Sequence, residues 1–188
     1  MINHLGTVEI NTHRLTLRKH VITDADDMFK NWVTDPEVSR YWCWEPHADI
    51  NETKAVLAEW IKDYEKQDTY HWIIVLKSVA QAIGYIYLNE INNANASASV
   101  HFALSRKFWN MGIMTEACKG VLDFAFTKLL CNEINSYHHI DNIASGQVMK
   151  KCGMRYVNTE YRQIPDYENI SGDYSYYKIT VDNWKCLI

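Results

Sequence analysis

The sequence lacks the features that mark several large classes of protein. Its 188 residues include seven glycines and three prolines, and no segment is a repeat or a biased tract. This composition argues against linkers and low-complexity regions. No apolar run is long enough to cross a bilayer, and residues 1–8 contain no apolar segment of the kind found in a secretory signal. We therefore expect a single globular domain over residues 1–188, with no membrane partner.

Cysteine is present without the spacing of a metal site or a redox pair. The five cysteines are Cys43, Cys118, Cys131, Cys152 and Cys186, and none belongs to a C-x-x-C pair. An odd number of cysteines without a secretory signal predicts free thiols and a cytoplasmic protein. His138 and His139 are adjacent in a predicted strand, where neighbouring side chains point to opposite faces. The sequence thus predicts no metal site.

Clusters of basic residues are also missing. The formal net charge is −4 at pH 7, and lysine and arginine form no run. Binding a polyanion requires clustered positive side chains, so a nucleic acid is excluded as a direct partner. Hydrophobic residues, by contrast, make up 47% of the chain, which is enough to build a well-buried core in a domain of this length.

The apolar patterns predict both strands and helices. Strands are predicted at residues 14–18, 71–76, 82–88, 97–104, 134–140, 155–162 and 174–181. One helix is predicted to begin after Thr23 as its cap and to end before Pro36. The others are predicted at 49–64, with Asp49 and Glu52 as a capping box, at 115–130, and at 142–152, where Gly153 is the stop.

The order of these elements predicts a mixed α/β (α+β) fold. Three consecutive strands between residues 71 and 104 are joined by short turns, which favours an antiparallel meander. The strand at 97–104, the helix at 115–130 and the strand at 134–140 form a β-α-β unit, whose strands pair in parallel. We expect a mostly antiparallel central sheet with this one parallel junction and with helices on both faces.

The segment Ser105–Ala117 joins a predicted strand to a predicted helix. A turn that opens a helix presents unpaired backbone N–H groups and the positive end of the helix dipole, which together suit a phosphate. Gly112 allows close approach of an anion, and Asn110 tolerates a left-handed conformation. The turn contains neither the Gly-Lys-Ser/Thr of a Walker loop nor three spaced glycines. On its own it predicts an anion site of no particular class.

Four stretches in this order resemble the GCN5-related N-acetyltransferases. They are W-E-P-H with D-I-N-E-T (44–53), F-W-N-M-G-I-M-T-E-A (108–117), N-I-A-S-G-Q-V-M-K-K-C-G-M (142–154) and Y-Y-K-I-T (176–180), the last followed by Asp182 and Trp184. Within that family they are most similar to the branch that acetylates ribosomal-protein N-termini and small-molecule amines (RimJ/RimL-like). The ordered set covers most of the chain.

The resemblance implies acetyl-CoA as donor, CoA as product, and direct transfer to a primary amine in a ternary complex. It implies that the turn binds the pyrophosphate through backbone N–H groups, that the strand before it pairs with the pantetheine arm, and that Asn142 also binds this arm. Ser145 would donate a proton to the departing thiolate. The implied cofactor-binding residues are Phe102, Ala103, Leu104, Trp109, Asn110, Met111, Gly112, Ile113, Met114, Thr115, Asn142 and Ser145.

The proton acceptors usual in the family are absent from their usual positions. Ser99 and Val157 stand where relatives carry acids, and Met149 stands where many carry a tyrosine. His101 and Glu90 are therefore the candidates for proton transfer, with Ser145 as the third catalytic candidate. His101 has the alternative role of a buried structural histidine, and Glu90 that of a solvated acid at a strand end. A non-catalytic acetyl-CoA sensor on the same fold is the alternative function.

An aromatic loop is the candidate wall of the acceptor pocket. Tyr41, Trp44 and His47 are its predicted substrate-binding residues, although tryptophans there also suit a core. A protein or peptide N-terminus, an amino acid, an aminoglycoside and a polyamine all remain open as acceptors, as does another acyl-CoA as donor. The net charge of −4 mildly favours a cationic acceptor. The resemblance also allows a homodimer.

Overall fold

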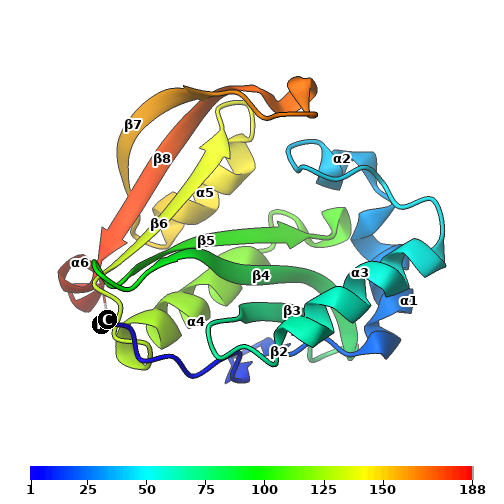
Figure 1. Cartoon of the computed structure of the whole chain (residues 1–188), viewed down its shortest axis with the longest axis horizontal. Coiled ribbons are helices and arrows are strands. Elements are labelled where there is room, and N and C mark those ends of the chain that lie inside the picture. Colours follow the sequence, from blue (N-terminus) through cyan, green and yellow to red (C-terminus); the bar gives the residue numbers. More distant parts are fainter. Residues whose placement is uncertain (188) are drawn as a thin grey trace.

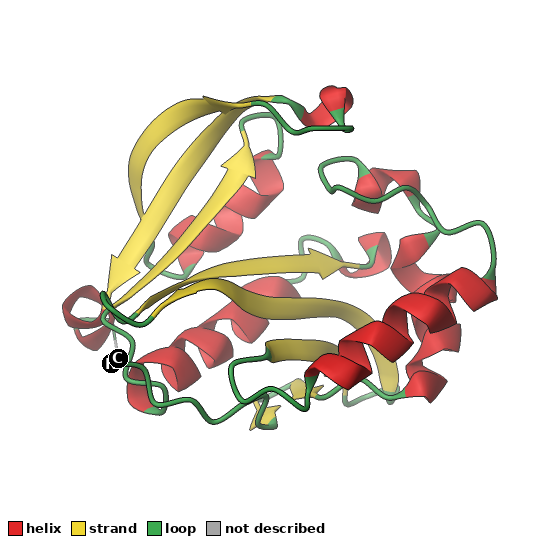
Figure 2. Cartoon of the chain, in the orientation of Figure 1, coloured by secondary structure: helices red, strands yellow, loops and turns green. Residues whose placement is uncertain are grey.

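The chain forms one eight-stranded sheet with helices on both faces (Figures 1 and 2). The computed structural model describes residues 1–187, with the backbone alone at residue 169. The strands are β1 (Ile10–Asn11), β2 (Leu15–Arg18), β3 (Tyr70–Leu76), β4 (Gln81–Asn92), β5 (Ser97–Leu104), β6 (Glu133–His139), β7 (Arg155–Arg162) and β8 (Gly172–Thr180), in the order β1-β2-β3-β4-β5-β6-β8-β7. The pair β5–β6 is parallel and the other pairs are antiparallel, which confirms the predicted fold class.

The two faces of the sheet carry separate cores. The α-helices are α1 (Ala25–Met28), α2 (Pro36–Ser39), α3 (Ile50–Asp63), α4 (Ile113–Thr127), α5 (Ile143–Lys151) and α6 (Val181–Lys185). Helices α4 and α5 cover one face, where alternate residues of β4 such as Ile86 and Leu88 are buried. Helices α1 and α3 cover the other, against Tyr85 and Ala103. No helix among residues 1–187 is long and apolar enough to cross a membrane.

The first predicted helix is wrong in its start and in its end. A 3₁₀ turn, η1 (Ile22–Asp24), precedes α1, and a π-helical turn, η2 (Phe29–Val33), follows it. Asp24 replaces Thr23 as the organising residue, since its carboxylate accepts from the backbone N–H of Val21 (2.8 Å) and pairs with Arg18 (2.7 Å). Pro36 does not end this helix; it opens α2, which Asp35 caps.

The other predicted elements exist, with ends that differ by a few residues. Asp49 caps α3 by accepting from the N–H of Asn51 and of Glu52, and the Glu52 carboxylate reaches Ala48 rather than Asp49 (2.8 Å). Helix α4 begins at Ile113, two residues before the prediction, because Gly112 turns the chain in a left-handed conformation. The short elements β1 and α6 had no recognisable pattern in the sequence.

Strands β5 and β6 diverge soon after they pair, and this divergence positions the functional site (Figure 1). Their register covers only Ser97–Ser99 against Glu133–Asn135. The Ser136 hydroxyl donates to the Val100 carbonyl at 2.7 Å, at the point where the strands separate. Beyond it β5 runs toward the turn before α4, while β6 continues with β8 and β7. A gap through the sheet results.

Candidate functional site

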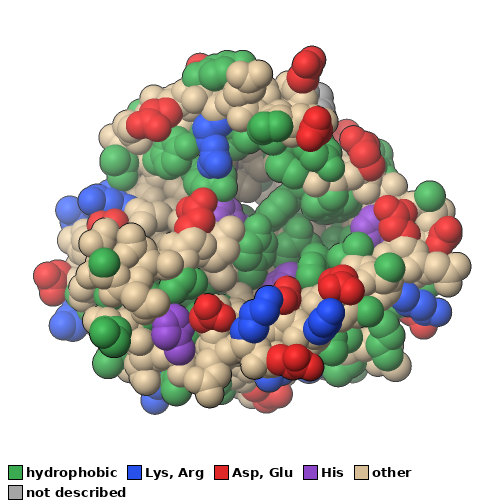
Figure 3. Space-filling view, in the orientation of Figure 1, with side chains coloured by type: hydrophobic (Ala, Val, Ile, Leu, Met, Phe, Trp, Pro, Cys, Tyr) green, Lys and Arg blue, Asp and Glu red, His purple; other side chains and the backbone are tan. Residues whose placement is uncertain are grey.

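A cavity of about 260 Å³ occupies the gap between β5 and β6. Figure 3 shows the molecule hollowed there, with hydrophobic side chains on the walls. The wall residues come from separate segments of the chain: the loop 41–44, Tyr87 on β4, His101 and Phe102 on β5, residues 136–139 on β6, the start of α5, and Arg162, Ile164, Ile170 and Tyr174 near the ends of β7 and β8. The cavity thus joins the α5 side of the sheet to the opposite face.

The turn before α4 has the conformation of an anion site. Asn110 and Gly112 both adopt positive φ, at 61° and 72°. The indole N–H of Trp109 donates to the Leu104 carbonyl at 2.8 Å and so fixes the turn to the end of β5. Within the described part of the chain, no backbone N–H of residues 110–115 has a hydrogen-bond acceptor. These donors, at the positive end of a 15-residue helix, fit the pyrophosphate of a coenzyme.

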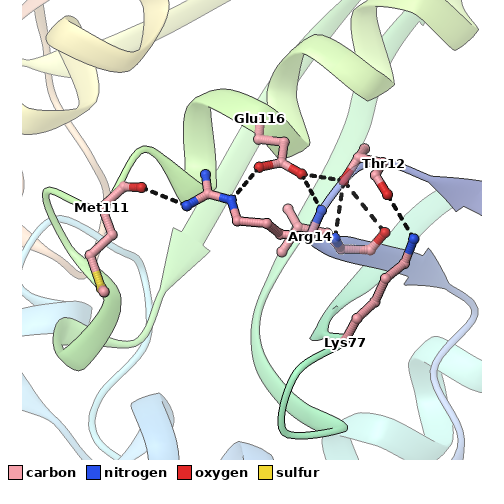
Figure 4. Close-up of polar contacts among 6 residues, drawn as sticks. Thr12, Arg14, Lys77, Met111 and Glu116 are labelled. Atoms are coloured by element: carbon pink, nitrogen blue, oxygen red, sulfur yellow. Dashed lines mark hydrogen bonds and ion pairs between the residues drawn. The ribbon is translucent and has the colours of Figure 1, made fainter.

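A polar brace behind this turn was missed by the sequence analysis (Figure 4). Glu116 accepts from the Thr12 hydroxyl (2.6 Å), from the Arg14 backbone N–H (2.8 Å) and from Arg14 Nε (2.6 Å). Arg14 Nη1 in turn donates to the Met111 carbonyl at 3.0 Å. Partial burial raises the pKa of Glu116, but the hydrogen bonds from Thr12 and Arg14 outweigh it, so that the pKa lies below its ordinary value. The brace ties the β1–β2 hairpin to the turn.

The free edge of β5 presents few backbone groups to the gap. Because the Val100 carbonyl faces β6, the N–H and C=O of Phe102, two residues further on, face the same way. By the same alternation Ala103 directs its backbone groups toward β4. The Leu104 carbonyl is occupied by the Trp109 indole. Of the three predicted pantetheine-pairing residues, Phe102 therefore offers both groups and Leu104 offers its N–H.

Asn142 and Ser145 lie together at the start of α5, on the cavity wall. The Asn142 carbonyl oxygen caps the helix by accepting from the Ser145 N–H at 3.2 Å, which leaves the amide nitrogen of Asn142 as a donor. Gly146 lets α5 lie close to β6, since a Cβ there would stand 2.6 Å from His138 Nε2. The Ser145 hydroxyl lines the cavity across from Phe102 on β5.

His101 and Glu90 have different surroundings. His101 is buried, and it packs against the rings of Tyr87 (5.3 Å between centroids) and Tyr137 (4.8 Å), with no partner for Nε2 among the described residues. Burial lowers the pKa of His101 to about 4, so its ring is neutral at pH 7. Glu90 is exposed and lies in a bulge of β4 with φ of 50°. Its Oε2 accepts from the Ser99 hydroxyl at 2.5 Å.

The aromatic loop supplies part of the cavity wall. Tyr41 and Trp44 line it, together with Trp42 and Cys43. His47 does not line it; this residue is buried, and its Nδ1 forms a hydrogen bond of 2.8 Å with the hydroxyl of Thr53 on α3. Sequence reasoning also missed Arg162, whose pattern was that of an ordinary strand. Among the described residues, no cluster of three or more His, Cys, Asp or Glu side chains could hold a metal ion.

Comparisons with known proteins agree with this geometry. Residues 14–155 match the acetyltransferase (GNAT) domain family. The chain is 28% identical over 162 residues to an uncharacterized N-acetyltransferase, p20, of Bacillus licheniformis, covering 86% of this chain and 88% of the relative.

Two solved structures share the fold. The ribosomal-protein-S5-alanine acetyltransferase of Vibrio fischeri superposes with a TM-score of 0.79 at 16% identity, over 94% of this chain and 98% of that one. The microcin C7 self-immunity acetyltransferase MccE, in complex with acetyl-CoA and AMP, superposes with a TM-score of 0.77 at 17% identity, over 90% and 93%. The chain therefore belongs to the GNAT acetyltransferase family, and it is an N-acetyltransferase that uses acetyl-CoA.

Proposed function

We propose that this acetyltransferase moves the acetyl group directly to a bound primary amine, in a ternary complex of protein, acetyl-CoA and acceptor. The observation that carries this proposal is the single cavity through the sheet, which connects the side of α5 to an aromatic chamber on the other face. Two substrates that enter from opposite faces meet in the gap. Such alignment contributes on the order of 7–11 kcal/mol to catalysis at best.

A covalent acetyl-enzyme is disfavoured by the one thiol on the described cavity wall. Burial raises the pKa of the Cys43 thiol, and the nearby Arg162 opposes this only in part. The thiolate is the nucleophilic form, so a raised pKa makes Cys43 a poor acyl acceptor. Direct attack by the amine needs no such group.

Bound acetyl-CoA supplies an activated thioester, whose C–S bond breaks as the C–N bond to the amine forms. The backbone N–H groups of residues 110–115 would hold the pyrophosphate. The N–H and C=O of Phe102, the N–H of Leu104 and the amide of Asn142 would hold the pantetheine arm. The Ser145 hydroxyl would donate a proton to the thiolate, so that the products are an N-acetyl amide and CoA with a free thiol.

The amine must lose one proton, and Glu90 is the better acceptor for it. His101, with its pKa lowered to about 4, would pay heavily to hold a proton in its buried site. Glu90 belongs to a strand bulge and contacts Ser99, the position where relatives carry an acid. Its carboxylate also raises the pKa of His101, which indicates that it lies near the chamber. We infer that Glu90 receives the proton, directly or through a water.

The acceptor belongs in the aromatic chamber formed by the loop 41–44, Tyr87, Tyr137 and Tyr174. The four stretches that resemble the ribosomal-protein branch support a peptide N-terminus or a small-molecule amine. The five free thiols support a cytoplasmic site of action. A non-catalytic sensor is the rival function, favoured by the missing acids at Ser99 and Val157.

The decisive experiment is transfer of label from acetyl-CoA to a panel of peptides, amino acids, aminoglycosides and polyamines. Label counting avoids the protein's own thiols, which would react in a thiol assay. We expect turnover on one class of amine. Tight binding of acetyl-CoA, measured by calorimetry on the same preparation, with no transfer to any acceptor would overturn the proposal in favour of the sensor.

A further inference from the structure

We propose that the acceptor is a primary amine that also carries an anionic group, a carboxylate or a phosphate, and that Arg162 binds that group. This inference rests on the proposed function and names its substrate class. Arg162 is the last residue of β7 and lines the cavity. Its guanidinium lies over the ring of Tyr137, 4.2 Å from the centroid, and 5.5 Å from that of Tyr174.

Arg162 is held in place without being neutralised. The two tyrosine rings restrain the guanidinium by cation–π contacts. No carboxylate among the described residues forms an ion pair with it. A guanidinium presents its N–H donors in a planar fork that suits the two oxygens of a carboxylate or a phosphate. The geometry is that of a preformed anion receptor.

The rest of the chamber carries little charge to compete with Arg162. Of the described residues on its wall, none is Asp, Glu or Lys. Burial keeps the pKa of His101 and that of His138 below the ordinary value, so both rings are neutral at pH 7. His139 faces the exposed Asp141 at 3.6 Å and stacks on Tyr41. The permanent charge of the wall is therefore positive, although the whole chain carries −4.

Glu90 supplies the complementary charge outside the wall. Its carboxylate raises the pKa of Arg162 and of His101, yet it forms no ion pair with the guanidinium among the described contacts. The site thus offers a carboxylate near β5, where the amine must react, and a guanidinium at the end of β7. An α-amino acid, a peptide with an acidic first residue and an amine with a phosphate group match this arrangement.

The walls between these two charges select a planar or apolar body. Tyr41, Trp42, Trp44, Tyr87, Tyr137 and Tyr174 line the chamber. Aromatic faces stack on rings and bury apolar surface. Polyamines and aminoglycosides, by contrast, carry several positive charges and would be repelled by Arg162. The chamber therefore reverses the preference that the whole-chain charge suggested.

Matched pairs of amines test the proposal. Phenylalanine is compared with phenylalaninamide, O-phosphoethanolamine with ethanolamine, and an Asp-Phe dipeptide amide with Asn-Phe amide, with spermidine as the polycation. We expect kcat/KM for the anionic member of at least one pair to exceed that of its neutral partner by about 10- to 100-fold, the range for a hydrogen-bonded charge pair. The pair that responds tells a carboxylate source from a phosphate source. Equal rates within every pair would overturn the proposal.

The variant Arg162→Gln tests the residue. We expect KM for the anionic amine to rise about 10- to 100-fold with a smaller change in kcat, and Arg162→Lys to recover part of the loss. Arg155→Gln, an exposed arginine on the same strand, is the control and should leave KM as it was. An unchanged KM in Arg162→Gln would overturn the assignment.

Calorimetry on the CoA-bound protein separates this inference from the proposed function. Binding of phenylalanine or O-phosphoethanolamine that Arg162→Gln abolishes supports the anion receptor even where no transfer occurs. Binding that is the same for anionic and neutral partners refutes the receptor even where transfer occurs. The labelled-transfer assay alone decides whether the protein is an active enzyme on that acceptor.

Discussion

The two sides of the cavity are built in different ways. On the coenzyme side, backbone atoms of a few consecutive residues do the binding, in the turn 109–112 and at the start of α5. On the acceptor side, side chains from five separate segments meet, among them Trp44, His101 and Arg162. The first side depends on local conformation and the second on the assembled fold. A ligand common to the whole family needs only the first, whereas acceptor choice is free to vary in the second.

The sharpest way to break the coenzyme side is Gly112→Val. Gly112 has φ of 72°, a conformation that a β-branched residue adopts only under strain, whereas its surroundings are open, with Arg14 Nη2 at 3.7 Å from a Cβ. We expect the Kd for acetyl-CoA to rise by about 100-fold, because both the strain and the altered N–H directions oppose binding. Gly112→Asn is the matched control, since asparagine tolerates this region. Calorimetry measures both, and equal affinities would refute the turn as the pyrophosphate site.

The same contrast explains what could be predicted from the sequence. The strand-turn-helix unit from Ser97 to Thr127 and the cap at Asn142 depend on short-range signals, and the structure has them close to where they were expected. The π-helical turn at 29–33 was missed because the tertiary pairing of Asp24 with Arg18 reorganises that segment. Arg162, Thr12 and Arg14 were missed because each acts across at least 25 residues of sequence, on Tyr137, Glu116 and Met111. His47 has the right position in its loop, but it faces α3.

Acid tests the acceptor side, because its histidines are buried in neutral form. The pKa of His101 is about 4 in the folded protein and about 6.5 in the unfolded chain. The unfolded state therefore binds more protons as pH falls from 6.5 toward 4, and stability is lost over this window. At pH 5 the loss from His101 is about 2 kcal/mol, and His20, whose pKa burial lowers to about 3, adds to it.

Urea unfolding at pH 7 and pH 5 measures this loss in the wild type and in His101→Phe. We expect the variant to show a smaller difference between the two pH values. His13→Asn, at an exposed position, should behave like the wild type. A wild-type stability that does not change between pH 7 and pH 5 would contradict the buried neutral state.

Ser145→Ala probes the point where the two sides meet. Its hydroxyl lines the gap, and the proposed role is to protonate the departing thiolate, so we expect kcat to fall about 10-fold. The Kd for acetyl-CoA should change little, because the backbone N–H of Ser145 still bonds to Asn142. Single-turnover kinetics with labelled acetyl-CoA separates these quantities. A wild-type kcat would remove Ser145 from the chemistry and leave it as a helix residue.

The smallest effect is expected at Glu116→Gln, which weakens the support of the turn without altering the turn itself. The amide keeps one acceptor for Thr12 and the Arg14 N–H but loses the ion pair with Arg14 Nε, a contact of 2.6 Å with a partly exposed partner. We expect a loss of stability of about 1 kcal/mol and a rise of about 2- to 5-fold in the Kd for acetyl-CoA, since Arg14 also holds the Met111 carbonyl. Asp123→Asn, an exposed acid on the same helix, is the control. A Kd in Glu116→Gln that equals that of the control, with stability lowered, would confine the brace to folding and leave the turn to hold its own conformation through Asn110, Gly112 and the Trp109 indole.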